Sequence, residues 1–570
     1  MVRHQNKINR KKINGHQINM ADLEQILDGD VTYENIVQNF EIPVIKSYNI
    51  AVDTVDKHAA GEKGDLIALI FESKEGATRS YTYRDLSELS DRFANFLRQK
   101  GVVKGDVVAC FTGQGLECAM AHLGSYKIGA IVAPLSHLYG PEAVKHVLDD
   151  CSPKVIVTQR DLWDRLSDFR DGLEIEQVIV SGEVKDGETD FYEILSIALN
   201  EQFCIETTDV DDPALLLYTS GSTGMPKGIL HRQGILRGYL SSVSLFYQLD
   251  LVVPNQVLWT VSDWSWVAGI FNVMLTGWYF GQTVVAGGQQ FSPDRTFDFI
   301  QRHGVTHCFL TPTALKRLAT KEKVGVVWKS LRLRAIGTGG EPLPGSVLKW
   351  ANEELHIPVN EFYGLTEVNH LIGNCARLWA IKPGSMGRAY PGHNLAVLDE
   401  AGIEVETGTV GEIAARDDDP TLFIGYWKNP RKTQEIRHGC WIRTGDFGYR
   451  DDEGYFWYKG REDDLIKSSG YRIGPAEIED ALVGHPSVAE AAVIGVPDPD
   501  RGQIIKAFVC LLENVTSSEE LSQELQKYVK QRLAFFKYPR LIEFVEEFPL
   551  TSTGKINRKE LRRREASNHC

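Results

Sequence analysis

One loop near the centre of the chain constrains its fold most. The apolar run Ala214–Leu217 is typical of a buried strand, and the segment YTSGSTGMPKG at 218–228 follows it directly. Glycines let the backbone approach a ligand closely, while hydroxyls, free N–H groups and Lys227 can donate to phosphate oxygens. The segment is not a Walker A loop, because Met225 and Pro226 precede the lysine. The chain therefore predicts a different kind of phosphate-binding loop after a buried strand.

Strands and helices alternate on both sides of this loop, which predicts βαβ units and parallel sheets. The expected strands cover residues 80–83, 107–111, 130–134, 154–158, 282–286, 307–311 and 334–337, and the expected helices cover 84–100, 116–129, 295–303 and 343–353. From Ala396 onward, short strands with frequent Gly and Asp turns indicate a β-rich subdomain. A charged turn at 460–464 precedes a compact α+β segment, so we place a domain boundary at Asp463.

Length and composition limit the class of protein. A chain of 570 residues is too long for one core, so two or more domains are expected. The formal net charge of −15 argues against a nucleic-acid partner. The nine cysteines form no CxxC pair and no zinc-like cluster with histidine, which favours a reducing, cytoplasmic location. No apolar run approaches about 18 residues, so no membrane span is expected.

The start of the chain differs from the rest. Residues 1–19 hold five basic residues and no acid, and they lack the apolar core of a secretory signal. We interpret residues 1–40 as a basic leader and N-terminal extension, and Met20 could be the natural start.

Further motifs share the order and spacing of one protein family. They are GTGGEP at 337–342, NEFYGLTE at 360–367, WIRTGD at 441–446, GREDDLIKSSGYRIGPAEIE at 460–479 and PLTSTGKINR at 549–558. Together with the central loop, this set resembles the adenylate-forming (AMP-binding) superfamily. Within it, the chain looks most like the short- and medium-chain AMP-forming acyl-CoA synthetases, and the resemblance covers about residues 40–565.

The resemblance implies an α/β fold and a two-step reaction. A large N-terminal adenylation domain, residues 41–462, would contain two sheet-and-helix halves and a β subdomain, and it would bind ATP and the acyl substrate. A small mobile α+β domain, residues 463–570, would swing about Asp463. A carboxylic acid and ATP would form acyl-AMP and pyrophosphate, and CoA would then accept the acyl group and release AMP.

The resemblance also assigns the phosphate and metal contacts. The β- and γ-phosphates would be held by Lys227 with Thr219, Ser220, Gly221, Ser222, Thr223 and Gly224. Glu367, with Thr219 or Thr366, would place Mg²⁺, which prefers hard oxygen ligands. Because the acid is already ionised at neutral pH, the first step needs positioning and cations rather than a general base. Lys555 would reach the α-phosphate and the incoming carboxylate.

Two further groups of residues would contact the rest of ATP and CoA. The nucleotide slot would be formed by Gly340, Glu341, Pro342, Glu361, Phe362, Tyr363, Gly364 and Thr366. Asp446 would accept hydrogen bonds from the ribose hydroxyls, since an ionised carboxylate is an acceptor only, and Arg461 would support it. Ser469, Gly470, Tyr471 and Arg472 would line the pantetheine path, while Arg501, Lys530, Tyr538 and Arg540 would meet CoA phosphates. We assign His231 a packing role.

The acyl pocket should lie beside the segment DWSWVAGIF at 263–271, with Trp266 near the carboxylate end. Acetate-specific relatives carry bulkier residues where this chain has Gly364, Gly339 and Ala268. We therefore expect room for a medium-chain, branched or small aromatic acid rather than acetate.

Other functions stay open at this point. The chain could load a separate acyl carrier protein instead of CoA. A luciferase-like oxygenase and a catalytically silent binding protein are further alternatives, although the expected charged positions are all filled. The oligomeric state is open.

Overall fold

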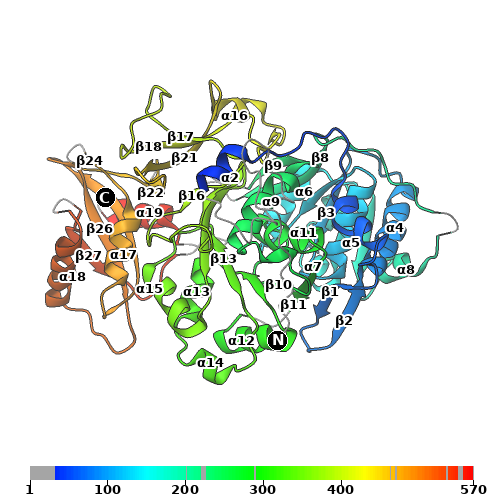
Figure 1. Cartoon of the computed structure of the whole chain (residues 1–570), viewed down its shortest axis with the longest axis horizontal. Coiled ribbons are helices and arrows are strands. Elements are labelled where there is room, and N and C mark those ends of the chain that lie inside the picture. Colours follow the sequence, from blue (N-terminus) through cyan, green and yellow to red (C-terminus); the bar gives the residue numbers. More distant parts are fainter. Residues whose placement is uncertain are drawn as a thin grey trace, which may run out of the picture.

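The computed structural model describes residues 33–199, 202–219, 226–287, 291–462, 464–468, 471–534, 537–549 and 556–568. Two large sheets with helices around them occupy most of the molecule, and a smaller α+β part (orange to red) lies at one end (Figure 1). This confirms the expected α/β class with a large N-terminal part and a small C-terminal part.

The first sheet has nine strands. Its order is β16 (Arg388–Ala389), β15 (Asn369–Gly373), β14 (Val359–Leu365), β13 (Ala335–Gly339), β12 (His307–Phe309), β10 (Val257–Thr260), β11 (Thr283–Gly287), β1 (Ile67–Glu72) and β2 (Thr78–Thr82). The strands from β14 to β1 pair in parallel, and the outer strands β2, β15 and β16 pair antiparallel. The carboxyl ends of the parallel strands therefore share one edge.

The second sheet has eight strands and carries the central loop. Its order is β19 (Gly425–Tyr426), β9 (Lys227–Arg232), β8 (Pro213–Thr219), β4 (Ile131–Pro134), β3 (Val107–Phe111), β5 (Val155–Gln159), β6 (Gln177–Ser181) and β7 (Glu188–Asp190). The strands from β8 to β7 are parallel, whereas β9 and β19 pair antiparallel. The expected parallel sheets are thus confirmed.

Helices connect and cover these strands. They are α2 (Tyr33–Asn39), α3 (Lys57–Ala59), α4 (Tyr83–Gln99), α5 (Leu116–Lys127), α6 (Pro141–Cys151), α7 (Arg160–Asp164), α8 (Phe191–Ser196), α9 (Ile235–Phe246), α10 (Val267–Gly269), α11 (Leu275–Tyr279), α12 (Pro293–His303), α13 (Pro312–Leu318), α14 (Val324–Val327), α15 (Gly345–Trp350) and α16 (Pro430–Glu435). Shorter helical turns are η2 (Val52–Asp56), η3 (Arg170–Gly172), η4 (Asp250–Val252), η5 (Ile270–Met274) and η6 (Ala351–Leu355). Helix α4 starts with a capping box, because Thr82 and Asp85 satisfy each other's backbone N–H groups.

Two smaller sheets follow. The β subdomain contains β17 (Leu395–Leu398), β18 (Gly411–Arg416), β20 (Arg437–His438), β21 (Trp441–Arg450) and β22 (Phe456–Arg461). The C-terminal part contains β23 (Ile466–Ser468), β24 (Tyr471–Ile473), β25 (Val488–Asp498), β26 (Gly502–Leu511) and β27 (Leu541–Phe544), with helices α17 (Pro475–Val483), α18 (Glu519–Arg532) and α19 (Arg558–Asn568). Asp463, our expected hinge, lies outside the described residues.

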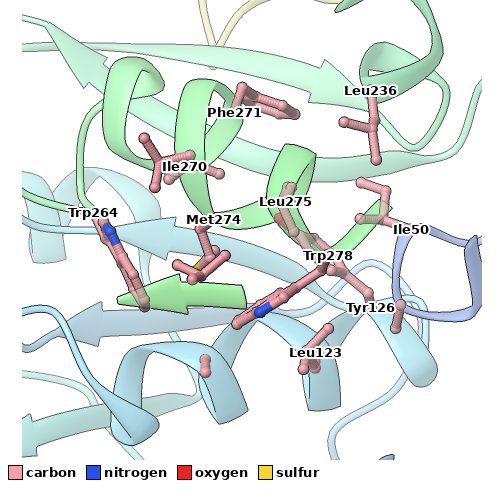
Figure 2. Close-up of a cluster of buried hydrophobic side chains, with 14 of the residues drawn as sticks. Ile50, Leu123, Tyr126, Leu236, Trp264, Ile270, Phe271, Met274, Leu275 and Trp278 are labelled. Carbon is pink, nitrogen blue, oxygen red and sulfur yellow. The ribbon is translucent and has the colours of Figure 1, made fainter. Parts of the chain in front are cut away.

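A large aromatic and aliphatic core lies where the two halves meet. Figure 2 shows Trp264, Ile270, Phe271, Met274, Leu275 and Trp278 packed toward Leu123 and Tyr126 of helix α5. The two tryptophan rings meet edge to face with centroids 6.3 Å apart. This packing fixes the chain immediately before and after Trp266, so one wall of the expected acyl pocket rests on a rigid support.

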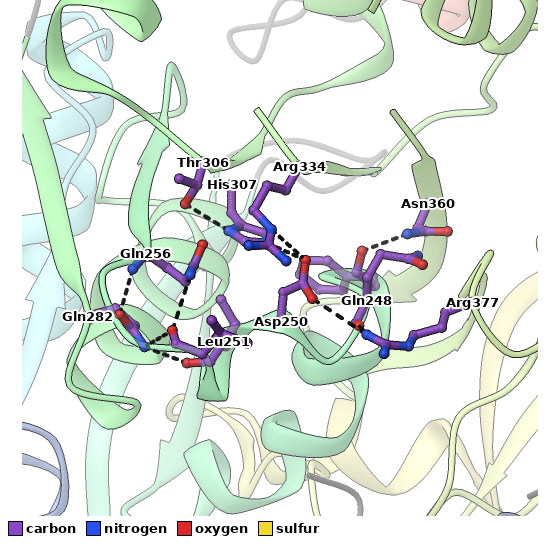
Figure 3. Close-up of polar contacts among 12 residues, drawn as sticks. Gln248, Asp250, Leu251, Gln256, Gln282, Thr306, His307, Arg334, Asn360 and Arg377 are labelled. Atoms are coloured by element: carbon purple, nitrogen blue, oxygen red, sulfur yellow. Dashed lines mark hydrogen bonds and ion pairs between the residues drawn. The ribbon is translucent and has the colours of Figure 1, made fainter. Parts of the chain in front are cut away.

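A polar cluster around the buried residues Asp250 and His307 ties together segments next to strands of the nine-stranded sheet (Figure 3). Asp250 lies 2.9 Å from the Nε of Arg334, 3.5 Å from Arg377 and 3.7 Å from His307. Burial holds the pKa of His307 below its usual value, while the neighbouring cations hold the pKa of Asp250 low. The arginine partners offset the desolvation cost of burying the ionised aspartate. We therefore interpret this cluster as one that stabilises the fold.

The first described helix belongs to the segment that we expected as an extension. In α2, the Tyr33 hydroxyl donates to the carbonyl of Ala389 at 2.8 Å, and its ring meets Trp379 edge to face at 5.2 Å. Residues 33–40 thus pack on the nine-stranded sheet. No helix in the described part of the chain has the length and apolar character needed to cross a bilayer.

Candidate active site

The central loop joins two antiparallel neighbours. Strand β8 ends at Thr219 and β9 begins at Lys227, and these two residues pair across the ladder. Of the loop residues that we expected to bind phosphate, Ser220, Gly221, Ser222, Thr223 and Gly224 lie outside the described residues. Thr219 and Lys227 stand at the two ends of the loop and place a hydroxyl and a cation there.

Lys227 and Glu367, the expected phosphate cation and metal ligand, meet in the structure. Their Nζ and Oε1 atoms are 3.1 Å apart, and Glu367 is nearly buried. Thr366, the neighbour of Glu367 in sequence, is half-buried. A carboxylate with adjacent hydroxyls is the donor set that Mg²⁺ prefers, so these residues fit such an ion.

A tyrosine that the sequence reasoning missed completes this group. The Tyr426 hydroxyl donates to Oε1 of Glu367 at 2.7 Å and accepts from Nζ of Lys227 at 3.2 Å. The available signal was the aromatic segment GYW at 425–427, directly before the Asn429 cap of α16.

A second polar group lies where β21 pairs with β22. Asp446 stands opposite Arg461 in the ladder, and its Oδ1 lies 3.3 Å from the Arg461 Nε. The Tyr363 hydroxyl donates to Oδ2 at 2.8 Å, and Tyr458, which the sequence reasoning also missed, donates to Oδ1 at 3.4 Å. Burial raises the pKa of Asp446, and Arg461 opposes that rise. A carboxylate can accept about four bonds, so it retains capacity for ligand hydroxyls.

The expected nucleotide slot contains two glutamates with backbone partners. Glu341 accepts from the amide and hydroxyl of Thr313, and Glu361 accepts from the amide of Leu343 at 3.0 Å. Burial raises the pKa of Glu361 to about 8, and the charge of Asp480 on α17 adds to this.

The remaining candidates for the nucleotide slot are Gly340, Pro342, Phe362 and Tyr363. Gly340 has a φ of +92°, a conformation that favours glycine. Pro342 follows Glu341 and is exposed. The Phe362 ring packs with Phe246 and His370, leaving Tyr363 as the half-exposed ring. Tyr363 is thus the better placed of the two to meet a base.

Trp266 lies beside the loop of residues 134–140, which contacts strand β8. Its ring meets Tyr139 edge to face at 5.9 Å, and the Tyr139 hydroxyl donates to the carbonyl of Tyr218 at 3.3 Å. The Trp266 amide donates to the carbonyl of Asp263, whose carboxylate accepts from Ser136. Residues 134–140 thereby connect Trp266 with the strand that carries Thr219.

The expectation that two glycines leave space in the acyl pocket is wrong. A Cβ on Gly364 would lie 1.6 Å from the carbonyl oxygen of Asn369, and one on Gly339 would lie 2.7 Å from the ring and carbonyl of Phe362. The places of both missing side chains are therefore filled. Ala268 stays half-exposed at the start of the helical segment, so it remains the small wall residue.

His231 has the packing role that we expected. It is fully buried in β9, and burial lowers its pKa to about 3, which keeps the ring neutral. A neutral buried imidazole is a poor catalytic base at physiological pH.

The C-terminal candidates are described only in part. Lys555, Ser469 and Gly470 lie outside the described residues, and of Tyr471 and Arg472 only the backbone in β24 is described. The Nζ of Lys530 and the guanidinium of Arg540 lie 5.3 and 5.1 Å from the ring centroid of Tyr538. Arg501 lies in the exposed turn between β25 and β26. Lys530, Tyr538 and Arg540 thus form a cluster with two cations.

Comparison with known proteins identifies the family. The AMP-binding enzyme family matches residues 55–427, and the AMP-binding enzyme C-terminal domain matches residues 477–555. The chain belongs to the adenylate-forming acyl-CoA synthetases. This AMP-binding enzyme is 36% identical over 520 residues to an acetyl-coenzyme A synthetase of Bacillus subtilis, covering 90% of each chain. It is 36% identical over 544 residues to the mitochondrial acyl-coenzyme A synthetase ACSM4 of Mus musculus, covering 93% of this chain and 92% of the relative.

The solved structures agree with this assignment. This AMP-binding enzyme resembles an anthranilate CoA ligase in complex with anthranoyl-AMP, with a TM-score of 0.82 and 26% identity, covering 92% of this chain and 99% of that one. The arrangement of a large α/β part followed by a small α+β part is therefore that of the family.

Proposed function

We propose that this enzyme activates a carboxylic acid with ATP and transfers the acyl group to CoA. In the first step a carboxylate oxygen attacks the α-phosphorus and pyrophosphate leaves, giving acyl-AMP. In the second step the sulfur of CoA bonds to the acyl carbon, AMP leaves, and the thiol proton passes to solvent. The observation that carries this proposal is the meeting of Lys227 with Glu367 at the end of the phosphate loop.

The proposal assigns each group a role by its chemistry. Lys227 and the loop residues bind the β- and γ-phosphates, where a fixed cation stabilises developing charge. Glu367, with Thr219 or Thr366, would hold Mg²⁺, which supplies further positive charge beside the phosphates when bound. Asp446 accepts hydrogen bonds from the ribose hydroxyls, and Arg461 holds the Asp446 carboxylate in place. Lys555 acts at the α-phosphate.

The proposed substrate is a medium-chain, branched or small aromatic acid. Ala268 provides a small, half-exposed wall residue close to Trp266, and this is the observation that supports a larger acid. The relatives include both an acetyl-coenzyme A synthetase and an anthranilate CoA ligase, so sequence similarity alone does not select the acid.

The reaction is tested with ATP, Mg²⁺ and acids from C2 to C10, plus benzoate and 2-methylbutyrate, each with and without CoA. Detection of acyl-CoA and AMP by mass supports the proposal. Acyl-AMP that reacts only with a carrier protein would support the alternative of carrier loading. The cations Lys530 and Arg540 favour free CoA, since they suit its phosphates.

The choice of acid is tested with Ala268→Leu. Pockets discriminate one methylene by about 1–3 kcal/mol, so the added side chain should shift the optimum of kcat/KM toward shorter acids by at least one or two carbons. Ala60→Leu, at an exposed alanine, is the matched control. A wild-type optimum at acetate would refute this part of the proposal while leaving the reaction itself intact.

The location also remains a proposal. We propose a reducing, cytoplasmic location from the cysteine pattern, whereas the mouse relative is named as mitochondrial. Fractionation of cells that express the full chain distinguishes the two.

A further inference from the structure

We propose that Tyr426 is a positioning residue that orients Glu367 for a divalent metal ion and links it to Lys227. The tyrosine hydroxyl lies between the two charged groups, 2.7 Å from Oε1 of Glu367 and 3.2 Å from Nζ of Lys227. A phenol has one hydrogen to donate and lone pairs to accept with, so it serves both neighbours at once. This inference rests on the proposed roles of Lys227 and Glu367.

The backbone fixes the place of this hydroxyl. The amide of Phe423 donates to the carbonyl of Glu367 at 2.9 Å, and the amide of Trp427 donates to the carbonyl of Gly228 at 2.9 Å. The amide of Tyr426 itself donates to the hydroxyl of Thr433 at 2.9 Å. The segment 423–427 is therefore bonded to the strand of Lys227 on one side and to Glu367 on the other.

The contacts converge on one oxygen of the carboxylate. Lys227 and Tyr426 both donate to Oε1 of Glu367, and within the described part of the chain no group donates to Oε2. Holding Oε1 sets the plane and direction of the carboxylate and leaves Oε2 as the atom for a metal or its bound water. Such outer hydrogen bonds commonly orient metal ligands.

The linkage to Lys227 gives the tyrosine a second task. If Lys227 turns toward a phosphate, it leaves Oε1, and the Tyr426 hydroxyl still holds the carboxylate. The Lys227 Nζ also lies 4.3 Å from the centroid of the Tyr426 ring, so a cation–π contact links the two residues in addition to the hydrogen bond. The tyrosine thus keeps the anion and the cation of the site in a defined relation.

A packing role makes different predictions. The Tyr426 ring meets Phe423 edge to face at 5.1 Å and is 8% exposed. Tyr426→Phe keeps this ring and removes only the hydroxyl. If Tyr426 served packing alone, Tyr426→Phe would therefore leave metal binding unchanged.

The test measures Mn²⁺ binding by electron paramagnetic resonance, with a non-hydrolysable ATP analogue present. The full chain is compared with Tyr426→Phe, Glu367→Gln and the double variant. Tyr192→Phe is the control, because it removes another tyrosine–carboxylate bond, to Glu117 at 3.2 Å, far from this site. We expect Tyr426→Phe to weaken Mn²⁺ binding by about 10–100-fold, with activity restored by raised Mg²⁺.

The double variant decides whether the tyrosine acts through Glu367. If it does, Tyr426→Phe adds no further loss in the Glu367→Gln background. Unchanged Mn²⁺ binding in Tyr426→Phe, or an additive loss in the double variant, overturns the inference and leaves the proposed function standing. Unchanged binding in Glu367→Gln overturns the metal role proposed for Glu367, and this inference with it.

Discussion

Gly364→Ala is expected to destabilise the protein strongly, although it adds one methyl group. The new Cβ would lie 1.6 Å from the carbonyl oxygen of Asn369, 2.5 Å from its carbon and 3.1 Å from the Cα of His370. Side-chain carbons do not approach backbone atoms more closely than about 3 Å, so strands β14 and β15 must separate locally. No side-chain rotation can relieve this contact, because all three of these atoms belong to the backbone.

The size of the effect follows from what holds Asn369. Its Oδ1 accepts from Tyr239 at 2.7 Å, its Nδ2 donates to the carbonyl of Thr421 at 3.0 Å, and the residue is 1% exposed. Displacing it strains two buried hydrogen bonds of about 1 kcal/mol or more each and adds about 1–3 kcal/mol of overpacking. We expect a total loss of about 3–5 kcal/mol.

The assay is urea unfolding followed by tryptophan fluorescence, read as a shift in the apparent midpoint. Gly325→Ala is the matched control, because nothing lies within 4 Å of its new Cβ and the residue belongs to helix α14. The control should be neutral or more stable by up to about 1 kcal/mol. A Gly364→Ala variant within about 0.5 kcal/mol of wild type would refute the reasoning.

Two further predictions concern charged groups. Lys555→Ala should slow acyl-AMP formation by at least about 100-fold, because a cation at the reacting phosphate contributes about 3–4 kcal/mol, yet it should leave thioester formation from supplied acyl-AMP nearly intact. Pyrophosphate exchange and single-turnover thiolation measure the two steps, and equal losses in both would contradict the assignment. Glu361→Gln should change the pH dependence of stability. Since burial raises the folded pKa of Glu361 to about 8, its stabilising contribution is complete below pH 4.5 and is lost as pH rises to about 8. The variant lacks this loss, so its stability relative to wild type should rise with pH by up to about 5 kcal/mol, and parallel pH profiles of unfolding would contradict the prediction.

Local chemistry predicted many elements well. The strand expected at 107–111 is β3 with the same bounds, because five consecutive apolar residues are bounded by polar turns. The helix expected at 84–100 is α4 from Tyr83 to Gln99, since a cap and a following glycine mark its ends. Such signals lie within a few residues of the element that they define.

Long-range contacts account for what sequence reasoning missed. Tyr426 lies 199 positions from Lys227 and 59 from Glu367, so no local pattern announces their contact. Gly364 was misjudged for a related reason. A glycine shows that a side chain is absent, but only the fold shows that the carbonyl of Asn369 occupies the place.

The short strand β19 has a mechanical consequence. It belongs in sequence to the β subdomain, yet it pairs with β9 at the edge of the eight-stranded sheet. The subdomain that carries Asp446 is thereby anchored to the same sheet that carries Lys227. A nucleotide held at one end by Lys227 and at the other by Asp446 would be bound by residues of one connected structural unit. Substitutions that weaken the pairing of β19 with β9 should then misalign the two ends of the nucleotide relative to each other. They should not weaken binding at only one of the two ends.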